Sequence, residues 1–168
     1  MREGRVDFYI GPDAGTKLGP ELTKTHVFGN RRTILCRSGH PLAGAKSLRD
    51  LSGADWITTS ITADAEDEIG ALFDLHGLPR PKLTVRSQSA LTLMMCLSST
   101  DLLAMVPVQW SDFVQTWTSL ATLDVTEELA APPIVVVTRS DLPLTPAATY
   151  LLDLMLRASA RARATVAS

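Results

Sequence analysis

The chain has 168 residues, which is enough for one domain or for two small lobes that share a core. Hydrophobic residues make up 45% and charged residues 20% of the sequence, and the formal net charge is −2, as in an ordinary globular protein. Basic residues gather only in the C-terminal RASARARA, which excludes a free-standing DNA-binding module with a basic face. Because no apolar run could cross a bilayer and no signal peptide is recognisable, we expect a cytoplasmic protein.

The N-terminal part of the chain predicts three strands. Alternating residues over 6–10 end at Gly11 and Pro12, which predicts a strand followed by a sharp turn. A loop is expected over 11–21, and an exposed or crossing strand over 21–28. The apolar run TILC over 33–36 predicts a short buried strand, in which Cys36 is a small buried side chain.

Helices and strands alternate in the middle of the chain. Ser47 is a good N-cap for a short helical turn that carries Asp50 at its third position. A buried strand is expected over 55–59, and a helix over 64–77 that Gly77 ends. A further strand over 82–86 leads to an apolar, buried helix over 90–97, which contains Cys96; a disulfide between the two cysteines is not expected.

The C-terminal part continues the alternation. We expect a strand over 101–106, a short helix over 110–117, an extended segment over 121–125 and a strand over 134–138. Thr145 and Pro146 are typical of the N-cap and first position of a last helix. Strands that alternate with helices predict parallel pairing and an α/β fold.

The sequence shows no catalytic constellation. There is no GxSxG, P-loop, HExxH or GxGxxG motif, and His26, His40 and His76 have no partners at metal-ligand spacing. His40 is expected to bond within a turn. Four acidic residues close together could hold a metal, namely Asp64, Glu66, Asp67 and Glu68. They are better explained as the solvated first turn of a helix. We therefore expect no enzyme activity, no cofactor and no metal.

Two aromatic residues and two polar turns remain. Trp110 and Trp117 would lie on one face of the same helix, where core or interface packing explains them better than nucleic-acid stacking. The polar turns over 58–62 and 87–89 each follow a strand and precede a helix. In open α/β sheets ligands bind at such places, and a carboxylate or sulfonate would suit hydroxyls and free N–H groups. Plain helix capping by Ser and Thr is the alternative.

Four phrases in a fixed order carry a family resemblance. They are GRVDFYIGP near the start, with Gly4, Val6 and Asp7; GHPL over 39–42, followed by Leu48, Asp50 and Leu51; MVP over 105–107; and a last phrase with Arg139, Leu144, Pro146 and Ala147. Together they resemble the effector-binding half of LysR-type transcriptional regulators. Thr100 and Asp101 stand where that family has a glycine pair.

The resemblance implies a two-lobed α/β fold of the periplasmic-binding-protein type 2. The second lobe, 29–125, would be complete, and the first lobe, formed by 1–28 and the returning segment 126–168, would lack its initial strands. The chain would be the sensor and oligomerisation module of a regulator whose helix-turn-helix has no counterpart here. Alternatives of the same architecture are a solute-binding protein and, with least support, a small α/β enzyme.

The resemblance also implies which residues bind the effector, in the cleft between the lobes. They are Thr58, Thr59, Ser60, Ser87, Ser89 and Pro107, with Gly11 and Pro12 from the first lobe. The effector would be a small organic anion, and a likeness to toluenesulfonate-degradation regulators suggests an aromatic acid. A homo-oligomer is implied as well, with an interface on the 64–77 helix at Ile69, Leu72 and Phe73.

Overall fold

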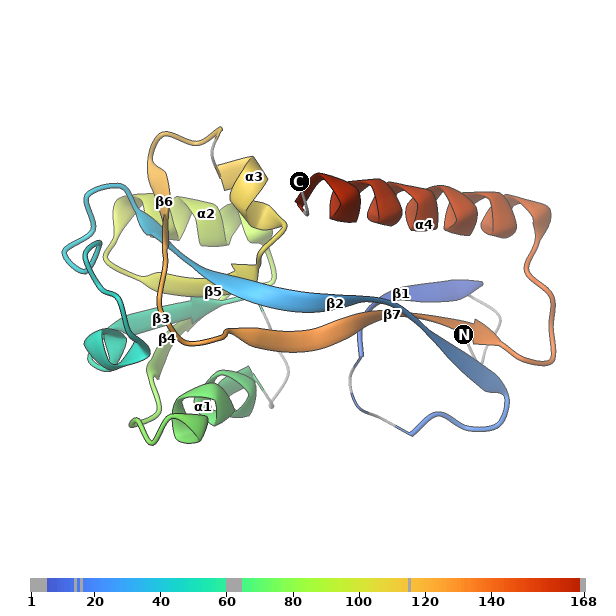
Figure 1. Cartoon of the computed structure of the whole chain (residues 1–168), viewed down its shortest axis with the longest axis horizontal. Coiled ribbons are helices and arrows are strands. Elements are labelled where there is room, and N and C mark those ends of the chain that lie inside the picture. Colours follow the sequence, from blue (N-terminus) through green and yellow to red (C-terminus); the bar gives the residue numbers. More distant parts are fainter. Residues whose placement is uncertain (1–5, 14, 16, 60–64, 115, 167–168) are drawn as a thin grey trace. The chain divides into compact units, whose positions relative to one another are not determined.

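The computed structural model describes residues 6–13, 15, 17–59, 65–114 and 116–166. The chain divides into two compact units, shown with their elements in Figure 1. Unit 1 consists of Met1–Asn30 with Pro132–Ser168, and unit 2 is the continuous segment Arg31–Ala131. The boundary falls within two long strands, β2 (Leu22–Arg37) and β7 (Ala130–Arg139).

Unit 2 is built on a mixed sheet. Strand β3 (Asp55–Thr58) is parallel to both of its neighbours, β4 (Lys82–Arg86) and β5 (Leu103–Pro107). The C-terminal half of β2 is antiparallel to β5 along one edge and to β6 (Leu120–Leu123) along the other. The parallel pairing expected from the alternation of strands and helices is therefore correct only for β3, β4 and β5.

Helices cover both faces of this sheet. Figure 1 shows α1 (Ala65–Leu75) on one side and α2 (Ala90–Ser99) with α3 (Trp110–Val114) on the other. Consecutive strand residues enter opposite core clusters, as Trp56 and Ile57 do, because side chains alternate across a sheet. Two-sided burial explains the apolar runs in β3, in β5 and in the C-terminal half of β2, whereas β4 alternates between half-buried and exposed residues.

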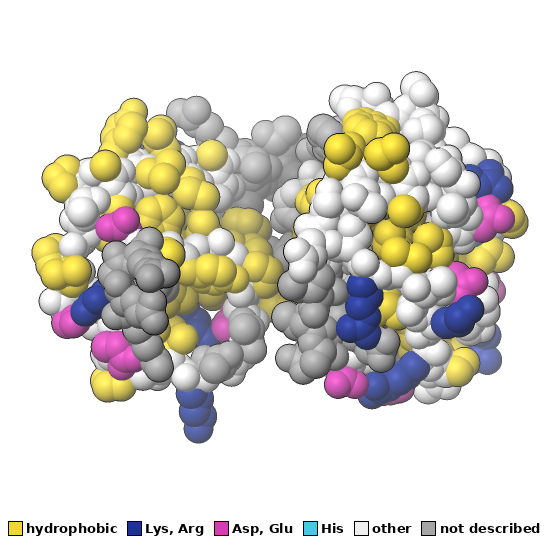
Figure 2. Space-filling model, turned by 180° about the vertical axis from the view of Figure 1, so that it is seen from behind, with side chains coloured by type: hydrophobic (Ala, Val, Ile, Leu, Met, Phe, Trp, Pro, Cys, Tyr) yellow, Lys and Arg dark blue, Asp and Glu magenta, His cyan; other side chains and the backbone are white. Residues whose placement is uncertain are grey.

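Unit 1 has a much smaller core. β1 (Phe8–Pro12) is antiparallel to β7, whose other neighbour is β2, and α4 (Pro146–Val166) completes the unit. The buried hydrophobic side chains described in it are those of Val135, Val136, Val137 and Ala148. Figure 2 shows hydrophobic side chains gathered on its surface, and Tyr150, Leu151 and Leu154 of α4 are exposed. Much of its apolar surface therefore remains in contact with solvent.

The helix ends confirm the local signals of the sequence. Ser47 forms a complete capping box with Asp50 on the 3-10 helix η1 (Leu48–Leu51). Gly77 adopts a φ of 64°, a left-handed conformation that glycine accepts most easily, just beyond α1. The Thr145 hydroxyl accepts a hydrogen bond from the N–H of Ala148 at 3.2 Å, as expected of an N-cap.

Several predicted boundaries were wrong. The strands expected over 21–28 and 33–36 are one continuous strand of 16 residues, β2. The polar residues between them interrupt the apolar pattern, but the ladder continues through them, since the N–H of Arg32 donates to the carbonyl of Leu129 at 2.8 Å. β1 runs through Gly11 and Pro12, where a turn was expected. The helix expected over 110–117 ends at Val114.

Candidate effector-binding edge of unit 2

The carboxyl ends of three parallel strands meet at one edge of the unit 2 sheet. β3 ends at Thr58, β4 is followed by Ser87, and β5 ends at Pro107. The N–H of Ser87 donates to the carbonyl of Thr58 at 2.9 Å, which holds the ends of β3 and β4 together. The structure therefore places three of the predicted residues along the same edge. We call this group of strand ends, with Ser89, the polar edge.

Ser89 caps helix α2, and Ser87 holds the backbone of that cap residue. The Ser89 hydroxyl accepts a hydrogen bond from the N–H of Thr92 at 3.3 Å, and the Ser87 hydroxyl accepts one from the N–H of Ser89 at 3.2 Å. The capping interpretation is thus confirmed for Ser89. It does not replace ligand binding as a prediction, because both residues stand beside the N-terminus of a helix of ten residues, where first-turn N–H groups attract anions.

The other predicted contacts differ in their surroundings. Thr58 is buried and Thr59 is exposed, whereas Ser60 lies outside the described residues. Pro107 is exposed at the end of β5. Gly11 and Pro12 belong to β1 of unit 1, where they pair with Val135 and Ile134 of β7. Their part in a binding site stays a prediction.

Sequence reasoning missed Arg32. Arg32 pairs with Pro107 in the antiparallel ladder of β2 and β5, so it stands beside the polar edge. Burial lowers the pKa of its guanidinium from the ordinary value. Arginine nonetheless keeps its charge in proteins, so the edge carries a half-buried cation. No local pattern could have identified Arg32, because Pro107 is far away in the sequence.

A second cation lies at the same edge. Arg86 is the last residue of β4 and pairs with Thr58 in the parallel ladder of β3 and β4. Its side chain is exposed, in contrast to that of Arg32. With Arg32 and the first turn of α2, the edge combines two guanidinium groups with backbone N–H donors, which suits a negatively charged group.

The structure explains His40 and one of the acidic residues at the start of α1 by contacts within the fold. His40 is buried: its Nδ1 accepts from the N–H of Leu42 at 3.0 Å, and its Nε2 lies 3.0 Å from the carbonyl oxygen of Asp101. The turn-bonding role is confirmed. Of the acidic residues at the start of α1, Asp67 forms an ion pair with Arg80 at 2.7 Å. In the part of the chain that the structure describes, no group of three His, Cys, Asp or Glu residues could hold a metal ion.

The proposed interface residues of α1 lie inside unit 2. Ile69, Leu72 and Phe73 are buried in the core cluster that contains Trp56, and the Phe73 ring packs edge-on against the Trp56 ring with centroids 5.9 Å apart. Their apolar spacing serves the core of this chain. The structure does not support direct contact of these three side chains with a second chain, so an interface on α1 would need its exposed residues.

Comparison with known proteins identifies the family. Residues 1–160 match the family model described as LysR substrate binding domain. A curated relative, the HTH-type transcriptional regulator GbpR of Rhizobium radiobacter, is 30% identical over 115 residues, which cover 66% of this chain and 37% of the relative. The chain belongs to the LysR substrate-binding domain family, the effector-binding part of LysR-type transcriptional regulators.

Solved structures of the same family share the fold. HinK, a LysR family transcriptional regulator from Pseudomonas aeruginosa, superposes with a TM-score of 0.74 at 18% identity over 94% of this chain and 55% of its own. The effector-binding domain of QuiR in complex with shikimate gives 0.72 at 17% identity, over 95% and 75%. The chain therefore has the periplasmic-binding-protein-like type 2 fold. It spans about a third of the length of GbpR and 49% of that of another Pseudomonas aeruginosa regulator, PA0477.

Proposed function

We propose that the polar edge of unit 2 binds a small organic anion, and that this chain is the sensing and oligomerisation module of a DNA-binding regulator. The observation that carries the proposal is that the half-buried Arg32, the exposed Arg86 and the N-terminus of α2 all lie along one edge of the sheet. DNA contact would belong to a segment outside this chain, and a cytoplasmic location goes with that role. In the described residues no helix is long and apolar enough to cross a membrane.

The chemistry of the edge favours a carboxylate or sulfonate. A guanidinium donates two parallel hydrogen bonds to such a group, and partial burial strengthens the attraction by excluding water. The likeness to toluenesulfonate-degradation regulators, together with shikimate in the QuiR complex, supports a ring-bearing acid. Binding would shift the population of regulator conformations by its differential affinity for them.

The experiment is a thermal-shift and calorimetric titration with a panel of acids, including benzoate, p-toluenesulfonate and shikimate. A ligand that binds only the folded chain raises the melting temperature, and at a hundredfold excess over Kd it adds about 2.7 kcal/mol. We expect at least one acid of the panel to do so. If none stabilises the chain, the proposed ligand class is wrong.

A matched pair of variants locates the binding. Arg32→Gln removes the half-buried cation, whereas Arg31→Gln removes its exposed neighbour on the same strand. Loss of a charged hydrogen bond costs about 1.5–3 kcal/mol, so we expect Arg32→Gln to weaken binding roughly 10- to 100-fold. Arg31→Gln should bind nearly as the native chain does. Equal affinities in both variants would remove Arg32 from the site.

A further inference from the structure

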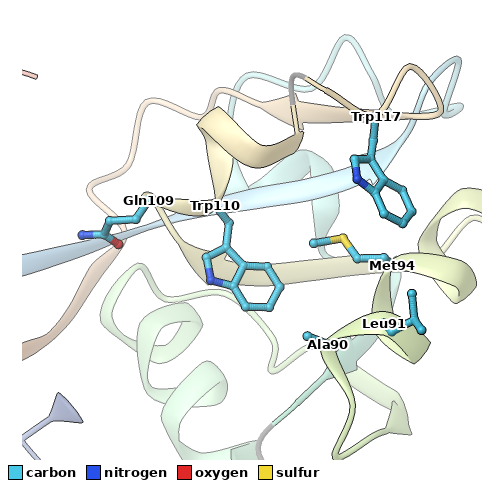
Figure 3. A pocket seen from close by; sticks show the side chains of 6 residues that line it. All are labelled: Ala90, Leu91, Met94, Gln109, Trp110 and Trp117. Atoms are coloured by element: carbon cyan, nitrogen blue, oxygen red, sulfur yellow. The ribbon is translucent and has the colours of Figure 1, made fainter. Parts of the chain in front are cut away.

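Unit 2 contains an apolar pocket that is lined by none of Thr58, Ser87, Ser89 and Pro107. It has a volume of about 320 Å³ and is lined by Ala90, Leu91 and Met94 of α2 together with Gln109, Trp110 and Trp117. Figure 3 shows the Met94 side chain extending from α2 toward the two indole rings. We propose that this pocket is a second binding site, which takes an uncharged aromatic molecule of one or two rings.

The lining determines the class of ligand. None of the six side chains is ionisable. Apart from the two indole N–H groups, the polar group among them is the amide of Gln109, which points away from the rings in Figure 3. A charged ligand would lose its hydration there without a compensating partner. Indole rings and a thioether instead make favourable contacts with the faces and edges of another aromatic ring. The volume lies at the lower end of the range for small-molecule sites, which fits one or two rings.

The pocket has a fixed floor and an open rim. Met94 is 3% exposed and belongs to the core cluster of Leu93 and Leu97, and both tryptophans pack partly against the same cluster. The backbone N–H of Trp117 donates to the carbonyl of Val114 at 2.8 Å, which ties the backbone that carries the second indole to the end of α3. At the rim, Leu91 is 60% exposed, so a ligand can enter from solvent. The floor is therefore preformed, which reduces the ordering cost of binding.

The test uses the full chain labelled with 5-fluorotryptophan and observed by fluorine NMR. Three resonances are expected, for Trp56, Trp110 and Trp117, and Trp110→Phe and Trp117→Phe assign them. The probe is 1-naphthol, with 1-naphthoate as its charged counterpart. We expect 1-naphthol to shift the Trp110 and Trp117 resonances saturably and to leave that of Trp56 unchanged, because Trp56 is buried in the other core cluster. The charged counterpart should bind at least about tenfold more weakly.

A matched pair of rim variants completes the test. Leu91→Glu places a carboxylate at the pocket, whereas Met95→Glu does so at a similarly exposed position, 61% against 60%, that does not line it. Leu91→Glu should weaken 1-naphthol binding about tenfold or more, and Met95→Glu should not. An unchanged Trp56 resonance shows that each variant is folded.

Three results of the binding experiments would overturn the proposal. They are the absence of a saturable shift, equal shifts of all three tryptophans, and equal affinities in the two glutamate variants. A shift of Trp110 and Trp117 with protein concentration alone, accompanied by association in light scattering, would also overturn it, since the pocket would then hold a second copy of the chain. Retained anion binding by Trp110→Phe and Trp117→Phe, which leave the first turn of α2 unchanged, would show that failure here does not concern the polar edge.

Discussion

His40 fastens a turn to a distant loop with a single buried ring. Its Nδ1 accepts a hydrogen bond from the N–H of Leu42, and its Nε2 lies within hydrogen-bond distance of the carbonyl of Asp101. The carboxylate of Asp101 in turn accepts a hydrogen bond from Nε of Arg37 at 2.7 Å. The neighbouring Thr100 hydroxyl donates to the carbonyl of Cys96 at 2.7 Å and so closes the end of α2. These contacts explain how Thr100 and Asp101 fit where the resembled family has a glycine pair.

The first prediction concerns this ring. His40→Ala leaves two part-buried groups, the N–H of Leu42 and the carbonyl of Asp101, without their partner, and an unsatisfied buried group typically costs about 1–3 kcal/mol. We expect the free energy of unfolding, measured in urea, to fall by that order. The control is His76→Ala, because His76 is exposed beyond the end of α1. Equal losses in the two variants would contradict the structural role of His40.

Glu127 stabilises an element to which it does not belong, the 3-10 helix η1. Its carboxylate accepts from the Ser47 hydroxyl at 2.6 Å and from the N–H of Leu48 at 3.1 Å. Burial alone would raise the pKa of this carboxyl, but the hydrogen bonds outweigh burial and lower the pKa below its usual 4.5. A lowered pKa means that the contacts stabilise the fold when Glu127 is ionised.

The second prediction follows from the lowered pKa of Glu127. With a folded-state pKa below the unfolded one, the stabilisation is complete at neutral pH and is lost as the pH falls from about 4.5 through the lower folded value. Glu127→Gln should therefore reduce stability by about 0.5–1 kcal/mol at pH 7, after allowance for solvent screening. The difference from the native chain should shrink in acid. Urea unfolding at pH 7 and pH 4 measures it, with Glu128→Gln as the exposed control. A pH-independent difference would be inconsistent with this explanation.

The sequence predicted helices and strands wherever the signal lies in neighbouring residues. It did not predict which distant residues the fold brings together. Capping residues, the left-handed Gly77 and apolar runs such as Trp56 and Ile57 are neighbours in sequence, so they placed most strands and helices. Arg32 joins the polar edge only through pairing with β5, and Trp117 reaches the pocket through a turn that no periodicity signals. The spacing of the two tryptophans predicted one helix face, whereas the helix stops before the second.

At the scale of the whole molecule, unit 1 has few buried hydrophobic side chains among its described residues. Its described buried hydrophobic side chains are four small ones, while α4 exposes Tyr150, Leu151 and Leu154. Apolar surface of this kind on a helix associates with other apolar surface. We therefore still predict a homo-oligomer, but we expect its interface on α4 and not on the buried face of α1.

Size-exclusion chromatography with light scattering measures this association. We expect the native chain to be larger than 18.1 kDa, its mass as a monomer, and to dissociate on dilution. Leu151→Glu combined with Leu154→Glu should shift it toward the monomer, because burying two carboxylates in an apolar contact is unfavourable. Leu75→Glu, on the exposed side of α1, is the control. A native chain that is monomeric at all concentrations would refute the prediction.

The segment Arg31–Ala131 begins and ends at neighbouring backbone positions, as the hydrogen bond between Arg32 and Leu129 shows. Topologically, unit 2 is an insertion whose ends already meet, so a short linker could close it without the rest of the chain. It also holds its own two-sided core, whereas unit 1 is formed by the flanking pieces. We therefore expect melting of the chain to comprise two transitions, so that a midpoint measured with one probe describes the unit that the probe reports on.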